Sequence, residues 1–393
     1  MVVVSHRSHR WLSSCLESVA GQCDELIVVD NGSAGGAVSS VAGGHGARVV
    51  ALSRNLGFPA GVNAGVEAAA GEVVALLNDD AMAHAGWLES ALRVLGDRSV
   101  AAVAPKLVFA LPFAEIRFPE EGHHVAGDAR RLGRAVRTAT IDGTEVLPHL
   151  FGPGLHAMES GVLDGVAGSW RWTSGGGAIY LRLEPGWESS RLLIDGEPAP
   201  VKGDVNLINN AGSYLSTEGH SGDHGYLAPD DGGFESPAER FGACGAALVT
   251  TREVLGRVGP LAGGFFAYYE DVDWCWRARL AGLKVLYEPA GVVRHVGGAS
   301  TGGPMASNVV SLAARNRLLC LARNAPLAVA AHQIRMALTA PVPGRLTSRR
   351  ARALLHLGRA MAERRGLARR RTCSPESVWE RWAGVDQTWP VPE

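Results

Sequence analysis

The chain has 393 residues, a length that suits one large domain or two domains of ordinary size. Hydrophobic residues make up 46% and charged residues 20%, as in ordinary globular proteins, and the formal net charge of −1 argues against a nucleic-acid partner held by bulk charge. The six cysteines form no Cys-x-x-Cys pair, and neither a secretory signal nor an apolar run of membrane-spanning length is found, so a cytoplasmic location with reduced thiols is expected.

Short apolar runs in the first part of the chain predict buried strands at residues 2–5, 25–29, 47–52, 73–77 and 100–108. Apolar residues at helical spacing predict helices between them, at residues 9–20, 59–70 and 85–95. Strands and helices that alternate at short spacing are typical of a doubly wound, Rossmann-like α/β sheet. We therefore expect such a sheet in residues 1–110, with the strand at 73–77 at its centre.

The sequence pattern changes near Leu111. Residues 111–203 show alternation and turn dipeptides, among them Asp195-Gly196, and predict a β-rich insertion. Residues 204–303 begin with a long polar segment and then predict strands at 242–250 and 285–287 and helices from 251 and at 270–281. Residues 304–393 predict a helical extension rich in arginine, at 307–340 and 349–382.

The central strand ends in Asn78, Asp79 and Asp80. In open α/β sheets, ligands bind at the carboxyl ends of the strands. Neighbouring carboxylate and amide oxygens suit a hard cation such as Mg2+ or Mn2+, which can bridge to a phosphate. Asn-Asp-Asp after a strand also fits a plain turn, as does Asp-Asn-Gly at 30–32 after the second strand, so these acids have a structural alternative.

Five short motifs follow one another along the chain. They are Val-Val-Asp-Asn-Gly-Ser at 28–33, Arg-Asn-Leu-Gly-Phe-Pro-Ala-Gly-Val-Asn-Ala-Gly at 54–65, Leu-Leu-Asn-Asp-Asp at 76–80, Phe-Phe-Ala-Tyr-Tyr-Glu-Asp-Val-Asp-Trp-Cys-Trp-Arg-Ala-Arg at 265–279 and His-Val-Gly-Gly-Ala-Ser at 295–300. In this order they resemble the inverting family 2 glycosyltransferases, particularly the bacterial rhamnosyltransferase-like branch, over residues 2–108 and 204–320. The resemblance implies a GT-A fold and a hexosyltransferase. Its donor would be a nucleotide-diphosphate sugar, dTDP- or UDP-linked, with dTDP-rhamnose favoured by the resemblance alone. Its acceptor would be a hydroxyl of a glycan, a lipid-linked molecule or a natural product.

The same resemblance implies a donor-binding half in residues 1–110 and an acceptor-binding, catalytic half in residues 204–303. In family members the residue matching Asp30 accepts a hydrogen bond from the nucleotide base, and Arg54 lies where it can reach a phosphate or the ribose. The residues expected to contact the nucleotide sugar are Ser5, His6, Asp30, Arg54, Asn55, Gly57, Asn63, Asn78 and Asp79.

The implied metal ligands are Asp80 and His295. Asp80 resembles the ligand of the family's Asp-x-Asp motif, and His295 stands where a histidine completes the metal site in some relatives. A lone histidine after a strand also has a purely structural interpretation. The first motif position is Asn78 rather than an aspartate, which lowers the ligand charge and weakens the expectation of tight metal binding without the donor. The cation, Mg2+ or Mn2+, would neutralise the diphosphate leaving group.

Three acids, Glu270, Asp271 and Asp273, open the helix predicted at 270–281. Acids in a first turn stabilise a helix through its dipole, which is the structural alternative for all three. Positions 271 and 273 point to nearly opposite sides, so they cannot share one catalytic role. The family pattern places the general base on Asp271, which would take the proton from an acceptor hydroxyl. The acceptor-binding residues implied on this segment are Glu270, Asp273, Trp274 and Trp276.

Arginines gather in the C-terminal extension, at 349–350, 364–365 and 369–371. Such a run is ordinarily a solvated face, but it could also attract an anionic membrane surface. That attraction would suit a lipid-linked acceptor and a peripheral position at the inner face of the membrane. A homo-oligomer is also compatible with the sequence.

Two other functions share parts of this pattern. A sugar nucleotidyltransferase would carry a Gly-rich triphosphate loop after the first strand, whereas residues 5–8 read Ser-His-Arg-Ser. A non-catalytic carbohydrate-binding protein on a decayed glycosyltransferase scaffold would bind through the β-rich insertion, but Asp80, Asp271 and His295 are retained at matching positions. In the polar segment, Asp223, His224 and Asp231 are further candidates for contact with either sugar.

Overall fold

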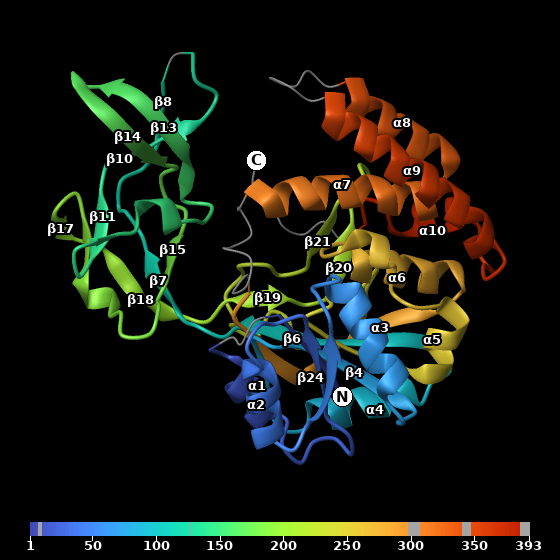
Figure 1. Cartoon of the computed structure of the whole chain (residues 1–393). Coiled ribbons are helices and arrows are strands. Elements are labelled where there is room, and N and C mark those ends of the chain that lie inside the picture. The colour runs from blue at the N-terminus through green and yellow to red at the C-terminus, as the bar shows by residue number, and fades with distance from the viewer. Residues whose placement is uncertain (7–9, 126, 298–306, 340–346, 386–393) are drawn as a thin grey trace. The chain divides into compact units, whose positions relative to one another are not determined.

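The computed structural model describes residues 1–6, 10–125, 127–297, 307–339 and 347–385. These residues form two compact units (Figure 1). The first holds Met1–Val108, Asn209–Tyr226 and the described residues from Gly232 onward, and the second holds Phe109–Ile208 and Leu227–Asp231. Contacts within the chain define these units, so the functional division into a donor half, an insertion, an acceptor half and an extension stays a prediction.

The first unit is built on a ten-stranded mixed sheet in the order β22-β24-β6-β23-β4-β1-β2-β3, to which β5 and β19 add. Its strands are β1 (Val2–Ser5), β2 (Ile27–Asn31), β3 (Arg48–Leu52), β4 (Val73–Asn78), β5 (Ala81–Ala83), β6 (Val100–Phe109), β19 (Ile208–Asn210), β22 (Ala238–Glu239), β23 (Ala247–Thr251) and β24 (Lys284–His295). β1 to β4 run parallel to their neighbours, whereas β23 runs antiparallel to β4. The predicted Rossmann-like sheet is confirmed, with β4 in its middle.

β2 lies two residues further along the chain than predicted, and two other strands differ more from the predicted bounds. β23 begins only at Ala247, because the residues before it turn beside the end of β4, where the carbonyl of Ala246 accepts from the Asn78 N–H at 2.9 Å. β24 continues to His295, although Glu288 and Pro289 interrupt the apolar pattern on which the shorter prediction rested. Its odd-numbered residues from Val285 to His295 are all buried, so the alternation of a half-buried strand persists through the interruption.

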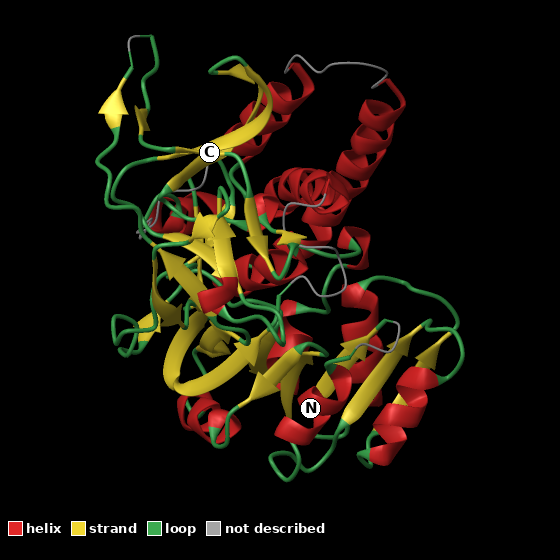
Figure 2. Cartoon of the chain, turned by 90° about the vertical axis from the view of Figure 1, so that its left-hand side faces the viewer, coloured by secondary structure: helices red, strands yellow, loops and turns green. Residues whose placement is uncertain are grey.

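Helices cover both faces of this sheet, because side chains alternate along each strand (Figures 1 and 2). On one face Val3 and Val28 pack with α1 (Leu12–Ser18), α2 (Ala37–Gly44) and α4 (Trp87–Leu95). On the other face Val2 and Val29 pack with α3 (Phe58–Ala68), α5 (Arg252–Val258) and α6 (Glu270–Leu280). Helix α2 was not predicted, because only two of its eight residues, Val38 and Ala42, are buried and leave little apolar periodicity.

Four C-terminal helices, all in segments where helix was predicted, belong to the first unit: α7 (Ser307–Asn324), α8 (Leu327–Thr339), α9 (Thr347–Ala368) and α10 (Pro375–Trp382). They share an apolar core with α6, in which the Trp276 ring stacks on Trp379 with centroids 5.9 Å apart. In the described part of the chain, no helix combines the length and the apolar character needed to cross a membrane.

The second unit is β-rich, as predicted, and consists of small antiparallel sheets. Its strands are β7 (Phe113–Ile116), β8 (His123–His124), β9 (Arg131–Leu132), β10 (Ala135–Val136), β11 (Ala139–Ile141), β12 (Thr144–Glu145), β13 (Leu155–Leu163), β14 (Val166–Thr173), β15 (Ile179–Arg182), β16 (Leu192–Ile194), β17 (Glu197–Pro198) and β18 (Val201–Val205). The dipeptide Asp195-Gly196 turns β16 into β17, and both residues have positive φ, as a two-residue hairpin of this type requires.

A buried ion network joins α6 to α7. Asp273 has 0% exposure, and its carboxylate accepts from Arg277 Nε at 2.8 Å, from Arg323 Nε at 2.7 Å and from Asn324 Nδ2 at 2.8 Å. Arg323 also pairs with Glu363 of α9. Burial by itself raises the pKa of Asp273, but the charges of Arg277 and Arg323 outweigh that effect and hold the pKa below its ordinary value.

Because the network is buried, the variant Asp273→Asn is expected to lower the free energy of unfolding by about 3–5 kcal/mol at neutral pH, as removal of one member of a buried ion pair does. A carboxyl with a lowered pKa in the folded state stabilises above its unfolded pKa of about 3.9, and that contribution is lost as the pH falls further. Urea unfolding at neutral pH and at about pH 2.5, below the unfolded pKa, measures both effects. The exposed pair Glu89–Arg93 supplies the control, and Glu89→Gln should cost less than about 1 kcal/mol. A loss below about 1 kcal/mol in Asp273→Asn would contradict this account.

Candidate active site

Polar residues gather at the carboxyl ends of the parallel strands. Ser5 of β1 lies opposite Asp30 of β2, and Val4 lies opposite Asn78 of β4, so all three strands end at one edge. Ser5 Oγ donates to Asp79 Oδ2 at 2.7 Å. This bond joins β1 to the turn Asn78-Asp79-Asp80 after β4, called the acidic turn below. Asp30 is buried and its Oδ1 accepts from the Ser33 N–H at 2.8 Å, the turn geometry that the sequence also allowed.

The loop between β3 and α3 is held by asparagines. The Asn31 amide donates to the Gly57 carbonyl at 3.0 Å and accepts from the Leu56 N–H at 2.9 Å, while Asn55 Oδ1 accepts from the Gly57 N–H at 2.8 Å. His6 Nδ1 lies 2.9 Å from the Asn31 carbonyl. These contacts bring His6, Asn55 and Gly57 together at the strand ends.

Two further residues predicted to bind the donor lie differently. Arg54 is exposed, so its guanidinium is accessible to a ligand. Asn63 uses both ends of its amide on the backbone of Leu261, donating to the carbonyl at 2.8 Å and accepting from the N–H at 3.0 Å. The Asn63 side chain therefore links α3 to the segment after α5.

The two predicted metal ligands are neighbours in space. His295 ends β24 opposite Ala81 of β5, and its Nε2 lies 3.2 Å from Asp80 Oδ1. Asn78 Nδ2 is 3.5 Å from the same nitrogen, and Asn209 Oδ1 is 2.8 Å from His295 Nδ1. No group of three or more His, Cys, Asp or Glu residues among the described residues could hold a metal. One carboxylate and one imidazole suit a cation that takes its other ligands from water and phosphate oxygens.

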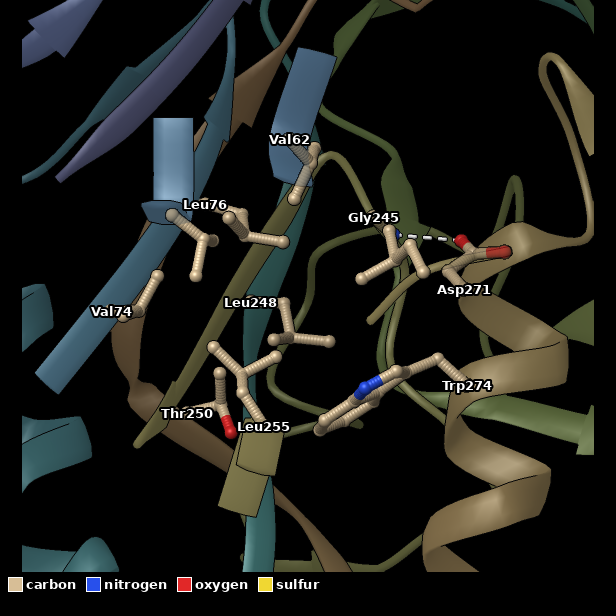
Figure 3. A pocket seen from close by; sticks show the side chains of 11 residues that line it. Val62, Val74, Leu76, Gly245, Leu248, Thr250, Leu255, Asp271 and Trp274 are labelled. Carbon is tan, nitrogen blue, oxygen red and sulfur yellow. Dashed lines mark hydrogen bonds between the residues drawn. The ribbon is translucent and has the colours of Figure 1, made fainter. Parts of the chain in front are cut away.

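Asp271 is held by the backbone that runs past the end of β4. Its Oδ2 accepts from the Gly245 N–H at 2.7 Å, and the next residue, Ala246, accepts from the Asn78 N–H at 2.9 Å. Figure 3 shows Asp271 and Trp274 on one side of a pocket whose other walls are mainly apolar. The pocket is lined by Val62, Val66, Val74, Leu76, Gly245, Leu248, Thr250, Leu255, Leu261, Asp271 and Trp274. Two neighbouring backbone groups thus connect Asp271 to the acidic turn.

Glu270 and Asp271 differ in how their charges are stabilised. Burial raises the pKa of Asp271, but N–H groups of Gly245 and Val272 that donate to its carboxylate oppose the shift. Burial raises the pKa of Glu270 well above its ordinary value, and the neighbouring charge of Asp271 adds to it. Glu270 is only 5% exposed, and its Oε2 has no hydrogen-bond partner among the described residues. Glu270 therefore has the more strongly raised pKa, and Asp271 is the acid whose charged form receives backbone hydrogen bonds.

Asp223 lies close to both parts of the site. It ends the hairpin of β20 (Ser213–Leu215) and β21 (Ser221–Asp223), where its Oδ1 accepts from Asn210 Nδ2 at 2.6 Å and from Ser213 Oγ at 3.4 Å. Burial raises the pKa of Asp223 to about 6; the charge of Asp271 adds to this shift, whereas the Asn210 hydrogen bond and the charge of His295 oppose it. Asp223 thus interacts with the predicted base and with a predicted metal ligand.

The other residues expected to bind the acceptor are in the interior. Asp273 is enclosed by the ion network, Trp276 has 0% exposure in the core shared with the C-terminal helices, and Trp274 Nε1 donates to the Gly259 carbonyl at 3.0 Å. Stacking of a sugar on Trp276 would require this core to open. Of the residues predicted to bind the acceptor, Glu270 precedes the base in the chain and Trp274 lines the pocket of Figure 3 together with it.

Two residues that hold this site were not predicted from the sequence. Asn209 orients His295, and the Gly245 N–H orients Asp271. The Asn-Asn pair at 209–210 in the polar segment was a weak signal for the first. No side-chain pattern could indicate the second, because the group that acts is a backbone amide.

Comparison with known proteins gives a match to the sequence profile described as Glycosyl transferase family 2 over residues 1–126. No curated protein matches the chain at a significant level. Among solved structures, GalNAc-T7, crystallised with UDP, GalNAc and Mn2+, aligns at 11% identity with a TM-score of 0.52, over 97% of this chain and 56% of that one. This chain thus spans little more than half of that protein.

Two further structures align less well. The mannosyltransferase PcManGT from Pyrobaculum calidifontis, solved with GDP-Man and Mn2+, has 16% identity and a TM-score of 0.37, over 96% of this chain and 84% of that one. Glucosyl-3-phosphoglycerate synthase from Mycobacterium tuberculosis has 20% identity and a TM-score of 0.23, over 27% of this chain and 44% of that one. The fold of the chain is of the GT-A glycosyltransferase type, and its residues 1–126 carry the sequence pattern of glycosyl transferase family 2.

Proposed function

We propose that this protein is a metal-dependent, inverting glycosyltransferase. It moves a hexose from a dTDP- or UDP-sugar, with dTDP-rhamnose among the candidate donors, to a hydroxyl of a glycan, a lipid-linked molecule or a natural product. Asp271 is the general base. The family match of residues 1–126 and the GT-A-type fold support the class of reaction.

One observation carries the proposal. Asp271 is hydrogen-bonded to Gly245, and the adjacent Ala246 is hydrogen-bonded to Asn78 of the acidic turn. A carboxylate that can accept a proton therefore lies close to the Asp80–His295 pair that can hold a cation. Sugar transfer needs both groups near one anomeric carbon, because the acceptor oxygen loses its proton while the diphosphate leaves.

The proton transfer depends on the different environments of Glu270 and Asp271. Asp271, whose carboxylate receives two backbone N–H groups, accepts the proton of the acceptor hydroxyl as the hydroxyl oxygen bonds to the anomeric carbon. The bond from that carbon to the diphosphate breaks, and the nucleoside diphosphate leaves from the opposite face, so the configuration inverts. The Gly245 N–H fixes the carboxylate orientation during this step.

Asp80 and His295 would hold Mg2+ or Mn2+, with Asn78 beside them. The cation would neutralise charge on the diphosphate leaving group. The nucleotide would lie at the strand ends and the loop that follows β3. The residues there are Ser5, His6, Asp30, Arg54, Asn55, Gly57 and Asp79. Asp223, within electrostatic reach of both Asp271 and His295, is placed to accept hydrogen bonds from hydroxyls of the transferred sugar.

The C-terminal arginines serve two purposes in this proposal. Arg370 and Arg371 donate to backbone carbonyls of Gly256 and Arg323, so part of the basic run stabilises the fold. Arg365 and Arg369 are exposed and remain candidates for contact with an anionic membrane surface that presents a lipid-linked acceptor. The protein would then act on the cytoplasmic side as a peripheral enzyme.

Calorimetric titration with UDP, dTDP and GDP, each with and without Mn2+, tests the donor site. We expect one nucleotide to bind, to bind more tightly with the metal, and to bind more weakly to Asp80→Ala, which removes the carboxylate ligand. If no nucleoside diphosphate binds, the donor site is absent, and a carbohydrate-binding protein on a decayed glycosyltransferase scaffold becomes the better explanation.

Asp271→Asn is expected to lower kcat by about 100- to 10,000-fold and to leave nucleotide affinity nearly unchanged, because the amide cannot accept the proton. Glu270→Gln is the matched control: it replaces the neighbouring carboxyl, whose pKa is raised well above its ordinary value, so its effect on kcat should be much smaller. Steady-state transfer kinetics measure both variants. Unchanged turnover in Asp271→Asn would overturn the assignment of the base.

A third variant, Asp223→Asn, is expected to be less active but more stable. A carboxyl whose pKa is raised to about 6 on folding destabilises the folded state as the pH rises from about 4 through 6, because the unfolded chain loses the proton more readily. The variant should therefore have a higher Tm than wild type at about pH 8, and the difference should shrink near pH 4.5. The exposed Asp24→Asn is the control. A lower Tm for Asp223→Asn than for wild type at about pH 8 would contradict the conclusion that the charged Asp223 carboxylate destabilises the folded state.

A further inference from the structure

The turn that precedes α6 has an unusual backbone. Phe266, Tyr268 and Tyr269 have φ values of 68°, 66° and 71°, a region that side chains other than glycine rarely adopt. Phe266 has ψ −53°, and the Ala267 N–H donates to the Phe265 carbonyl at 2.9 Å, so Phe266 is the centre of a strained γ-turn. Such conformations persist only where surrounding contacts hold them, and they concentrate at functional sites.

Asn316 of α7 supplies most of these contacts, and its neighbour Arg315 donates to the Phe265 carbonyl at 2.8 Å. Its side chain has 0% exposure, and its Nδ2 lies 3.0 Å from the Phe265 carbonyl, 2.7 Å from the Ala267 carbonyl and 2.7 Å from the Tyr268 carbonyl. Asn316 Oδ1 accepts from Arg315 Nη2 at 2.7 Å, which sets the amide with its NH2 group toward the turn. One buried amide thus bonds to three carbonyls of the strained segment.

The turn connects the two halves of the proposed site. On one side Tyr269 is the N-cap residue of α6 and immediately precedes Glu270 and Asp271. On the other side the Phe266 carbonyl accepts from the Phe58 N–H at 2.7 Å, at the start of α3. A Cβ on Gly57 would come within 2.4 Å of that same carbonyl oxygen. The turn can therefore approach residues 54–57, the loop proposed to bind the donor and called the donor loop below, only because residue 57 is glycine.

We propose that Asn316 is a positioning residue for the transfer reaction: by holding the turn at 265–269, it sets Asp271 relative to the loop at 54–57. This inference rests on the proposed function, because it assigns to Asn316 the alignment of that base with the donor. Asn316 touches neither substrate nor reacting atoms. Helix α7 acts on α6 at a second point as well, through Arg323, Asn324 and Asp273.

The test compares three variants of the full chain. Asn316→Ala removes the amide, and Asn316→Asp keeps its size and its acceptor toward Arg315 but turns an oxygen toward the three carbonyls. Leu321→Ala is the control, because Leu321 is a fully buried residue of α7 that lies against Gly219 and has no polar group to bond to the carbonyls of the turn. Large-to-small substitutions of this kind destabilise a protein substantially, so the control reveals the effect of stability alone.

Both Asn316 variants are expected to lower kcat by about 10- to 100-fold at a temperature where they are fully folded, because small displacements of a reacting group have effects of this size. The affinity for the nucleoside diphosphate should stay within about threefold of wild type, since Asn31 and Asn55 hold the donor loop independently. Leu321→Ala should keep its kcat despite a lower Tm. If kcat falls in proportion to Tm in all three variants, Asn316 has only a structural role and the proposal is overturned.

Hydrogen exchange separates failure of this proposal from failure of the proposed function. The amides of Ala267 and Asp273 are bonded to the carbonyls of Phe265 and Tyr269, so both should exchange faster in the Asn316 variants and not in Leu321→Ala. Unchanged exchange would show that Asn316 does not hold the turn. Faster exchange with unchanged kcat would overturn the positioning role. Faster exchange in a protein whose wild type transfers no sugar from any donor would instead count against the glycosyltransferase proposal.

Discussion

Helix α6 carries three acids in its first turn, and the protein gives each a different environment. Asp273 is buried among two arginines and an asparagine, which keep it ionised and tie α6 to α7. Asp271 receives N–H groups of Gly245 and Val272 on its carboxylate, whereas Glu270 is buried beside that charge, and one of its oxygens has no partner within the described part of the chain. The helix dipole favours all three equally well, so the separation of their roles comes from what surrounds them.

The site depends on this helix being fixed at both ends of its first turn. The arginine network holds it from one side, and the strained turn at 265–269 determines the direction from which the chain enters. Residues of α7 take part in the arginine network and also bond to the turn. The turn in addition contacts the start of α3, where the Phe266 carbonyl accepts from the Phe58 N–H. In this way a helix of the C-terminal extension contributes to the alignment of two loops that belong to the α/β sheet.

Stability and reactivity oppose each other at several of these positions. The pKa values of Glu270, Asp271 and Asp223 are raised on folding. At neutral pH each of these carboxyls therefore lowers the free energy of unfolding, because its charged form is more stable in the unfolded chain. Positive φ at Phe266, Tyr268 and Tyr269 adds backbone strain in the same region. Costs of this kind are typical of functional sites, where the arrangement required by the chemistry is not the most stable one.

The sequence by itself determined the parallel strands of the sheet, because alternating buried strands and helices leave few other arrangements, and Ser5, Asp30 and Asn78 stand at the ends of these strands. Its motifs also predicted Asp80 and His295 as metal ligands and Asp271 as the general base, and these roles stay predictions. Only the tertiary structure revealed the burial of Asp273 and Trp276, and the contributions of Asn209, Gly245 and Asn316. These depend on contacts between residues far apart in the chain, and in part on backbone groups, which leave no periodic or compositional pattern in a single sequence.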